Sequence, residues 1–461
     1  MTIHVRGGIS VHEIAEITSG TIVNPADVKI KHITTDSRDV PSGALFIAIR
    51  GERFDGNEYL ASAFEKGAVC ALAERVSEGS HGCVVIVKDT RVALGQLAKA
   101  YKEKIAPLTV AVTGSVGKTT TKEFIYAVLS EKYKTLKTSG NFNNEIGLPM
   151  TLLGLSFDDN AVVLEMGMSG SGEIDYLSRI AVPNIGVVTN IGTSHIGQLG
   201  SREAIRDAKL EIKNGFSKDG VLILNADEPL LAGVEGAIYV GKENPTADCR
   251  IENIVEGENG TAFDLVIRNE KYESITIPVI GEHNVLNAAF AWQVGMIAGL
   301  GEFEIRRGLM RFKNPGMRQN IFDANGITVM EDCYNAAPES MQASLKVLSN
   351  MAKRKHCRSV AVLGDMKELG EYSKEAHQKV GAAVAAYDID VLIAFGEQAI
   401  HIAESALRFG LNAENVYVFP DEKNYDAPGR ALRRIIKRSD VVLFKGSRAM
   451  AMERLVEYLK K

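Results

Sequence analysis

From residue 108 onward, hydrophobic positions fall into short runs that alternate with stretches of helical periodicity. Four apolar runs predict buried strands: Leu108–Val112, Ala161–Met166, Ile185–Thr189 and Val221–Leu224. Between them, apolar residues recur every three or four positions, as expected for helices that cover a sheet. Strands that alternate with helices are typical of a mostly parallel sheet with both faces covered. The pattern therefore predicts an α/β domain that begins near residue 106.

Two regions of different pattern flank this domain. The first 105 residues contain short β-like runs at Leu45–Ile49 and Val84–Val87 and a helix-like stretch at 92–101. Near Lys313–Gly316, Pro and Gly interrupt the chain, and no apolar periodicity crosses them. A second strand–helix series follows, with predicted strands at Ile327–Met330, Val360–Leu363, Val391–Phe395, Val416–Phe419 and Val441–Phe444. We expect Asp248–Ile280 to form a β meander that departs from the central sheet.

The predicted fold class is therefore α/β, in three domains. Residues 1–105 would form a small α/β module, residues 106–314 a central, mostly parallel sheet, and residues 315–461 a Rossmann-like domain. The third domain has no phosphate-binding turn after its first strand, so we expect it to complete a site and not to cradle phosphates itself.

A glycine-rich turn follows the first strand of the central domain. The segment is Thr113-Gly114-Ser115-Val116-Gly117-Lys118-Thr119-Thr120, and a helix-like stretch comes directly after it. Glycine can adopt positive φ and lets backbone N–H groups approach a phosphate closely. The helix N-terminus and Lys118 add positive charge, and the Thr119 hydroxyl is a candidate Mg²⁺ ligand. The usual longer P-loop would have a glycine where Val112 stands, so the match is to the shorter G-x-x-G-K-T, and it predicts binding of a nucleoside triphosphate.

Composition narrows the class of protein further. The chain has 461 residues and a formal net charge of -5, which gives no electrostatic reason to expect nucleic-acid binding. Its five cysteines form no C-x-x-C pair, as in proteins of reducing compartments. The N-terminus lacks an apolar segment of signal-peptide length, and no apolar run is long enough to span a bilayer. We therefore expect a cytoplasmic protein.

Two side chains near predicted strand ends and one lysine in a helical stretch are candidates for chemistry, since ligands of open α/β sheets bind beyond the carboxyl ends of the strands. Glu165 ends an apolar strand, where it is either a Mg²⁺ ligand or part of a structural ion pair. His195 follows the next strand; such a histidine is either a solvated loop residue or a group that faces the same crevice. Lys209 lies in a helical stretch, where an exposed, solvated lysine is the ordinary interpretation.

Further polar residues lie later in the chain. The helix start at Gly281–Asn287 carries His283 and Asn287, which could hold a nucleotide base, although simple capping by Asn284 explains the segment equally. In the third domain, polar residues end three predicted strands on one rim. These segments are Asp332-Cys333-Tyr334-Asn335, Gly364-Asp365 and Lys445-Gly446-Ser447-Arg448.

Taken together, these segments resemble the Mur ligase family, whose members are ATP-dependent enzymes that add amino acids to the peptidoglycan precursor. The resemblance spans essentially the whole chain. The turn Thr113–Thr119 is similar to the family's phosphate loop, which also has the shorter spacing. Asn141-Phe142-Asn143-Asn144-Glu145-Ile146-Gly147 resembles the family's Asn-rich turn near substrate and metal, which implies substrate contacts for Asn141 and Asn144.

The resemblance also implies roles for the strand-end residues. Thr119, Glu165 and His195 would bind Mg²⁺. Lys209, in Ala-Lys-Leu-Glu-Ile, matches the lysine that CO₂ carbamylates in this family, so that it bridges to a second Mg²⁺. His283 and Asn287 match the adenine-binding segment, and Asp332 would also contact the nucleotide.

Three segments favour the branch of the family that adds D-alanyl-D-alanine to UDP-N-acetylmuramoyl-tripeptide. Thr35-Asp36-Ser37-Arg38, followed by Gly51-Glu52-Arg53-Phe54-Asp55-Gly56, resembles the UDP-sugar-binding module. Asp332–Pro338 resembles the D-x-Y-N-A-x-P turn of this branch, with Tyr334 and Asn335 toward substrate, and Gly364–Gly370 resembles its G-D-M-x-E-L-G. Ala337 stands where Asn is common and Asn57 where His is common, and neither change removes a charged or metal-binding group.

The implied reaction begins when the terminal carboxylate of the tripeptide attacks the γ-phosphate of ATP. The resulting acyl phosphate is then attacked by the amine of the dipeptide. Lys118, Lys209, His195 and Arg318 would be the catalytic residues, with Arg318 at the migrating phosphoryl group. We expect a monomer in which the third domain closes about Pro315-Gly316.

Three other classes of protein remain as alternatives. One is another ligase on the same scaffold, which adds a different amino acid, or adds glutamate to folate. A second is a switch or transport NTPase, although that class needs the longer loop. A non-catalytic binding protein is the third.

Overall fold

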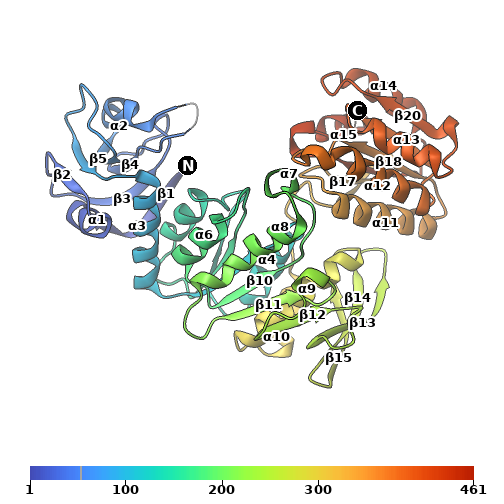
Figure 1. Cartoon of the computed structure of the whole chain (residues 1–461), viewed down its shortest axis with the longest axis horizontal. Helices are drawn as coiled ribbons and strands as arrows, with labels where there is room; N and C mark the ends of the chain where they lie inside the picture. Colours follow the sequence, from blue (N-terminus) through green and yellow to red (C-terminus); the bar gives the residue numbers. More distant parts are fainter. Residues whose placement is uncertain (52–53, 461) are drawn as a thin grey trace.

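Three α/β units follow one another along the chain, each built on its own sheet (Figure 1). The structure is a computed structural model that describes residues 1–51 and 54–460. The N-terminal unit is blue in Figure 1, the middle unit runs from teal to yellow, and the C-terminal unit is orange to red. This architecture confirms the predicted α/β class and its division into three domains.

The N-terminal unit has a six-stranded sheet in the order β1-β3-β4-β5-β6-β2. Its strands are β1 (Thr2–Ser10), β2 (Thr21–Val23), β3 (Lys29–Thr34), β4 (Ala44–Ile47), β5 (Ala68–Ala73) and β6 (Cys83–Ile86). Its helices are α1 (Val11–Thr18), α2 (Leu60–Lys66) and α3 (Thr90–Ile105). The four inner strands are parallel, and β1 and β2 join the two edges antiparallel.

The middle unit has a nine-stranded sheet in the order β15-β14-β13-β12-β11-β10-β7-β9-β8. Its strands are β7 (Leu108–Thr113), β8 (Thr135–Lys137), β9 (Ala161–Glu165), β10 (Ile185–Val188), β11 (Val221–Asn225), β12 (Ala237–Gly241), β13 (Cys249–Glu256), β14 (Thr261–Ile267) and β15 (Glu270–Ile277). Its helices are α4 (Lys118–Leu129), α5 (Gly147–Leu153), α6 (Glu173–Ala181), α7 (Ile196–Leu199), α8 (Arg202–Leu210), α9 (Glu282–Ile297) and α10 (Glu302–Met310).

Strand β7 is the topological switch point of this sheet. After β7 the chain crosses to β8 and β9 on one side, and it then returns to β10 on the other side. Both neighbours run parallel to β7, so the carboxyl ends of β7, β9 and β10 meet at one edge. Ligands of open α/β sheets bind at such a point. The fold therefore brings the glycine-rich turn and the chain after Glu165 and Val188 to the same place.

The hydrophobic alternation along β7 explains how helices cover both faces. Val110 and Val112 belong to one core together with α4 and α9, whereas Ala111 faces a second core with α3, α5 and α6. Helix α9 is buried almost all round, because it lies between α4 and the strands β12 to β14.

One prediction about the middle unit is wrong. The segment Asp248–Ile280 was expected to leave the central sheet, but β13 pairs parallel with β12, and β14 and β15 continue the same sheet antiparallel. The periodicity of a meander shows that its strands pair with one another. It does not show whether the first strand also pairs with a strand before it.

The C-terminal unit has a six-stranded sheet in the order β16-β17-β21-β18-β19-β20, parallel except for β16. Its strands are β16 (Asn320–Ala324), β17 (Ile327–Asp332), β18 (Ser359–Gly364), β19 (Val391–Phe395), β20 (Val416–Phe419) and β21 (Val441–Lys445). Its helices are α11 (Pro338–Lys355), α12 (Ser373–Ala386), α13 (Ile400–Arg408), α14 (Asp426–Ile435) and α15 (Glu453–Lys460). Within the described residues, no helix is long and apolar enough to cross a membrane.

Helix α3 packs the N-terminal unit onto the middle unit. The Tyr101 hydroxyl donates to the carbonyls of Arg6 and Leu155, at 2.9 and 3.0 Å, and so ties β1 to the end of α5. The Tyr176 hydroxyl on α6 donates to the Arg91 carbonyl at 3.1 Å. The helix thus belongs to the cores of both units, as Figure 1 shows by its place between them.

Substitution of Trp292, the one tryptophan of the chain, tests the packing of α9. Its side chain is fully buried, and its Nε1 has no hydrogen-bond partner among the described residues. Trp292→Ala should lower the free energy of unfolding of the middle unit by about 3–5 kcal/mol, because it leaves a large cavity. Trp292→Phe keeps an aromatic ring and removes the unpartnered N–H, so it should cost much less. Urea unfolding followed by circular dichroism measures both; equal losses would contradict this view of the core.

Candidate functional site

The glycine-rich turn has the geometry of a phosphate-binding loop. Gly114 and Gly117 have φ of +147° and +84°, so both adopt conformations that L side chains avoid. A Cβ at Gly114 would overlap Thr189 Oγ1. Helix α4 begins at Lys118, which directs its free N–H groups toward the loop. Ser115 Oγ is buried without a hydrogen-bond partner among the described residues, as expected of a group that forms its hydrogen bond with a bound ligand.

The chain that follows β10 supports this loop. Asn190 Oδ1 accepts hydrogen bonds from the backbone N–H groups of Ser115 and Val116, at 3.1 and 3.0 Å. The Thr189 hydroxyl donates to the Val116 carbonyl at 2.6 Å. The sequence analysis did not identify Asn190. Its position directly after a buried strand could have placed it at the ligand-binding edge of the sheet.

Lys118 lies across the loop. Its Nζ donates to the carbonyl of Gly114 at 2.7 Å and to that of Ser115 at 3.3 Å. Burial lowers the pKa of Lys118, and the nearby Arg318 lowers it further, whereas Glu165 raises it. The positive charge is therefore incompletely compensated by the protein, and a phosphate group would compensate it.

Glu165 ends β9 and is 3% exposed. Its Oε1 accepts a hydrogen bond from Asn143 Nδ2 at 2.9 Å, and its backbone N–H donates to Thr138 Oγ1 at 3.0 Å. Its Oε2 is buried and has no hydrogen-bond partner among the described residues; Lys122 Nζ lies 3.8 Å away. A free, buried carboxylate oxygen beside a phosphate loop fits an oxygen-seeking cation such as Mg²⁺.

The Asn-rich turn lies against Glu165, and its three asparagines behave differently. Asn143, which the sequence did not single out, makes the contact with Glu165. Asn144 Oδ1 accepts from the backbone N–H of Gly147, the first residue of α5, at 2.9 Å. Asn141 is exposed, with its side chain open to a ligand.

His195 and Lys209 come from the segment after β10. His195 caps α7 with a positive φ of 65°, and its Nδ1 lies 3.3 Å from Glu368 Oε2 of the C-terminal unit. Burial lowers the pKa of His195; Glu368 raises it, and Lys118 and Lys209 lower it, so these charges lie near one another. The structure therefore brings Lys118, His195 and Lys209 together at one edge of the sheet.

Lys209 ends α8 and is 1% exposed, so the interpretation of a solvated surface lysine is wrong. Among the described residues, its amine forms no ion pair and no hydrogen bond. Burial lowers its pKa well below the usual range, and the charge of Lys118 lowers it further. A buried lysine without a counter-ion is expected to be neutral, and a neutral amine is a nucleophile.

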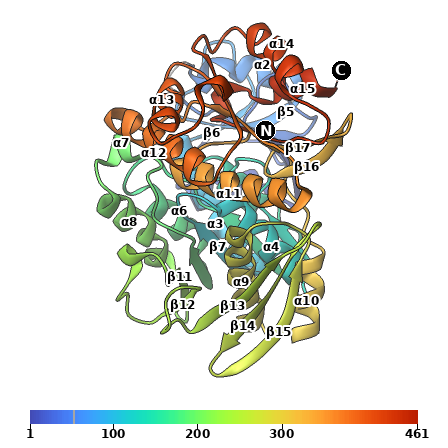
Figure 2. The same ribbon diagram turned by 90° about the vertical axis from the view of Figure 1, so that its right-hand side faces the viewer.

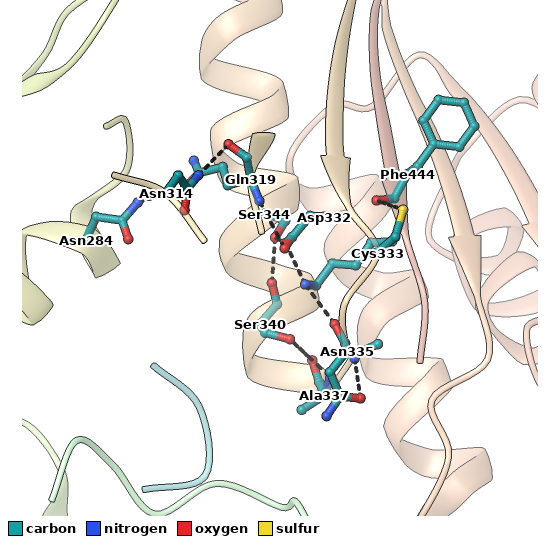
Figure 3. Close-up of polar contacts among 12 residues, drawn as sticks. Asn284, Asn314, Gln319, Asp332, Cys333, Asn335, Ala337, Ser340, Ser344 and Phe444 are labelled. Carbon is teal, nitrogen blue, oxygen red and sulfur yellow. Dashed lines mark hydrogen bonds and ion pairs between the residues drawn. The ribbon is translucent and has the colours of Figure 1, made fainter. Parts of the chain in front are cut away.

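In the C-terminal unit, Asp332 is held by three groups at the end of β17 (Figure 3). Lys445 Nζ donates to its Oδ2 at 2.6 Å, Ser344 Oγ donates to the same oxygen at 2.7 Å, and the Gln319 backbone N–H donates to Oδ1 at 3.2 Å. Burial raises the pKa of Asp332, but Lys445, Ser344 and Arg318 together lower it more, so the pKa lies below its usual value. Asp332 is therefore an ionised carboxylate whose oxygens are engaged within its own unit.

The residues beside Asp332 face the middle unit. The Arg318 guanidinium stacks on the Tyr334 ring at 4.1 Å, and its charge acts on both Lys118 and Asp332. Asn335 is exposed; its Oδ1 accepts from the Ala336 backbone N–H at 2.9 Å, and its carbonyl accepts from Lys445. The charges of Arg318 and Glu368, both in the C-terminal unit, thus reach Lys118 of the phosphate loop.

The predicted base-binding residues lie at the start of α9. Asn287 is buried, and its Oδ1 accepts from Thr121 Oγ1 at 3.0 Å, close to Gly117 of the loop. His283 is exposed. Asn284 Nδ2 donates to the Ile280 carbonyl and to Gln319 Oε1, at 2.8 and 2.7 Å, so it links α9 to the C-terminal unit and does not cap the helix. Figure 3 shows Asn284 and Gln319 on opposite sides of this boundary.

The predicted UDP-sugar segment lies in the N-terminal unit, after β3. Asp36 accepts two bonds from the Arg38 guanidinium, both at 2.8 Å, and Arg38 holds the Asp36 pKa well below its usual range. Thr35 and Ser37 are partly exposed beside them. Glu52 and Arg53 of the second quoted segment lie outside the described residues. In the same unit, a pocket of about 450 Å³ is lined by Arg50, Gly51, Glu74, Lys88, Asp89, Thr90 and Arg91.

The C-terminal unit contacts the loop that carries His195. Glu339 Oε1, at the start of α11, accepts from Thr193 N–H and Oγ1 at 3.1 and 3.2 Å. The Tyr372 hydroxyl donates to the Gly200 carbonyl at 2.9 Å. Figure 2 shows α7 beside α12 and α11 facing the middle unit. The third domain therefore packs against the loop that carries His195, and its role in completing the site stays a prediction.

No cluster of three or more His, Cys, Asp or Glu side chains within the described ranges could hold a metal on its own. Mg²⁺ in nucleotide sites uses one or two carboxylates together with phosphates and water, so a dedicated protein cage is not required. Glu165 fits this chemistry through its buried Oε2, which has no hydrogen-bond partner among the described residues.

Models of the Mur ligase family match most of the chain. The Mur ligase family catalytic domain matches residues 29–102, the Mur ligase middle domain 112–295, and the Mur ligase glutamate ligase domain 317–448. The UDP-N-acetylmuramoyl-tripeptide--D-alanyl-D-alanine ligase of Bacillus subtilis is 39% identical over 98% of both chains.

Solved structures agree with these matches. The crystal structure of MurF from Acinetobacter baumannii has a TM-score of 0.89 and 31% identity and covers 98% of this chain and 99% of its own. MurF ligase from Thermotoga maritima, solved in complex with ADP, has a TM-score of 0.82 and 30% identity and covers 93% and 96%. The chain belongs to the Mur ligase family.

Proposed function

We propose that the chain is an ATP-dependent ligase that adds D-alanyl-D-alanine to UDP-N-acetylmuramoyl-tripeptide, with release of ADP and phosphate. The observation that carries the proposal is the convergence of Lys118, Glu165, His195 and Lys209 at the switch point of the middle sheet, facing Arg318. Relatives of nearly the same length bear the name of this ligase, and one of them was solved with ADP.

The first step joins two anions. The tripeptide carboxylate attacks the γ-phosphorus, and the bond from this phosphorus to the β-γ bridging oxygen breaks. The products are an acyl phosphate and ADP. Two unit charges about 4 Å apart repel by about 4 kcal/mol at an effective dielectric near 20, and a triphosphate carries several charges. Neutralisation is therefore the main task of the site. Lys118 and the N-terminus of α4 would neutralise part of the negative charge of the phosphates.

Mg²⁺, when bound, supplies Lewis-acid stabilisation of the phosphoryl oxygens. Thr119 and Glu165 would hold one ion, and His195 with Lys209 would hold a second. Lys209 would do so as a carbamate, since reaction of its amine with CO₂ gives an anionic oxygen ligand. Its burial, its lack of a counter-ion and its lowered pKa support this proposal, because only a neutral amine attacks CO₂.

The second step needs alignment. The dipeptide amine attacks the acyl carbon, the C–O bond to phosphate breaks, and a proton leaves the new amide nitrogen. Correct placement of reactants contributes up to about 7–11 kcal/mol. Closure of the C-terminal unit about Pro315-Gly316 would bring Arg318 to the migrating phosphoryl group, with Asp332, Tyr334 and Asn335 on its substrate-facing rim.

The remaining assignments belong to the same proposal. His283 and Asn287 would flank the adenine, Thr35–Arg38 would contact the UDP-sugar, and Asn141 and Asn144 the peptide. We place the domain boundaries after residues 105 and 314. The enzyme would act as a monomer in the cytoplasm, where ATP and a UDP-linked substrate are both available.

Phosphate release with a set of second substrates tests the proposed reaction. ATP and UDP-N-acetylmuramoyl-tripeptide would be combined with D-Ala-D-Ala, D-Ala, diaminopimelate or glutamate. We expect release that depends on D-Ala-D-Ala and a product heavier by that residue pair. Release that depends on another amino acid would reject this substrate, and hydrolysis indifferent to all four would reject ligase chemistry.

Replacement of Lys209 tests the carbamate. Lys209→Ala should lower kcat by about 10²-fold or more, because a ligand to transition-state charge is lost. Short carboxylic acids such as acetate should restore part of this activity in Lys209→Ala, since they supply the missing oxygens, but they should not affect a Lys118→Ala variant. Full activity of Lys209→Ala without added acid would contradict the assignment.

A further inference from the structure

Lys122 is a second fully buried lysine near the phosphate loop, and the reaction described above does not use it. It lies one helical turn after Lys118 on α4 and is 1% exposed. Its Nζ donates to the Thr138 carbonyl at 2.8 Å and pairs with Glu123 Oε1 at 3.1 Å. Two of its three donor positions are thus satisfied.

The third side of this ammonium faces Glu165. Lys122 Nζ lies 3.8 Å from Glu165 Oε2, which is the buried oxygen without a hydrogen-bond partner. Within the described part of the chain, this is the one ion pair that Glu165 makes. The distance is too long for a hydrogen bond but short enough for a strong Coulomb interaction in a buried site.

The charges of the lysines and glutamates around Lys122 compensate one another as a group of four. Glu123 also pairs with Lys137, whose side chain is 30% exposed and lies over the Tyr126 ring. Two cations, Lys122 and Lys137, therefore face two anions, Glu123 and Glu165. The contacts with Thr138 and Glu123 fix Lys122 in place, so it remains near Glu165 whatever binds there.

We propose that Lys122 is a positioning residue that acts as a resident counter-ion of Glu165 and makes metal binding depend on the nucleotide. The inference rests on the proposed role of Glu165 as a Mg²⁺ ligand. A divalent cation that binds Glu165 alone is repelled by the buried ammonium. When the cation arrives bound to a triphosphate, the negative charge of the triphosphate offsets this repulsion. Lys122 thereby discourages binding of the metal before ATP.

Metal binding without nucleotide tests this role. Mn²⁺ takes the same oxygen ligands as Mg²⁺, and the loss of its free electron paramagnetic resonance signal measures binding. Lys122→Met should bind Mn²⁺ about tenfold more tightly than the wild type, because the repulsion is removed. Lys137→Met is the matched control: it removes a cation from the same group without touching Glu165, so its affinity should stay within about twofold. No gain in Lys122→Met, or an equal gain in both variants, would overturn the inference.

A second variant serves if Lys122→Met does not fold by circular dichroism. Glu123→Gln leaves Lys122 with Glu165 as its only carboxylate partner, so Mn²⁺ alone should bind more weakly than to the wild type. Unchanged or tighter binding would overturn the inference.

Glu165→Gln separates this inference from the proposed function. With ATP present, Glu165→Gln should lose most Mn²⁺ affinity. Retention of wild-type affinity would reject Glu165 as a ligand, and with it both proposals. Loss in Glu165→Gln, together with no gain in Lys122→Met, would reject only the role of Lys122.

Discussion

Buried charge at the carboxyl ends of β7, β9 and β10 is the constraint on which the rest of the site depends. Glu165 and Lys209 are buried and Lys118 is partly buried beside them, and isolated charges in such a place are costly. The protein accommodates each of these three charges in a different way. Glu165 faces Lys122, Lys209 is driven toward its neutral form, and Lys118 rests on loop carbonyls. Triphosphate and divalent metal would complete this balance, which gives the fold its preference for such ligands.

The C-terminal unit is organised on a different principle. On its rim, Lys445 and Ser344 hold the Asp332 carboxylate by hydrogen bonds within the unit. Its polar contacts with the middle unit lie at two places. Glu339 and Tyr372 meet the loop that carries His195, and Gln319, Lys346 and Arg354 meet α9 and β13. A rim whose carboxylate is already held in place suits a domain that must position one substrate against another.

Local patterns predicted much of this architecture, and their failures have physical causes. The glycine-rich turn and the strands around it were found because a buried parallel strand is a continuous apolar run. Strand β1 has no such run, and the parallel pairing of β12 with β13, the strand that follows it, is a contact between segments that no periodicity reveals. Asn143, Asn190 and Lys122 were missed for the same reason: each acts on a side chain or loop from another strand. Lys209 had no local signal of its burial, and only the family resemblance reversed its ordinary interpretation.

The central claim is that the site brings a carboxylate onto the γ-phosphate. Transfer of an oxygen atom from the substrate carboxylate to the released phosphate tests this claim most directly. The tripeptide would carry ¹⁸O in its terminal carboxylate, and the released phosphate would be analysed by mass spectrometry after reaction with D-Ala-D-Ala. An acyl phosphate places one substrate oxygen in each phosphate released. Phosphate without ¹⁸O would show that water attacks ATP, and it would contradict the ligase mechanism.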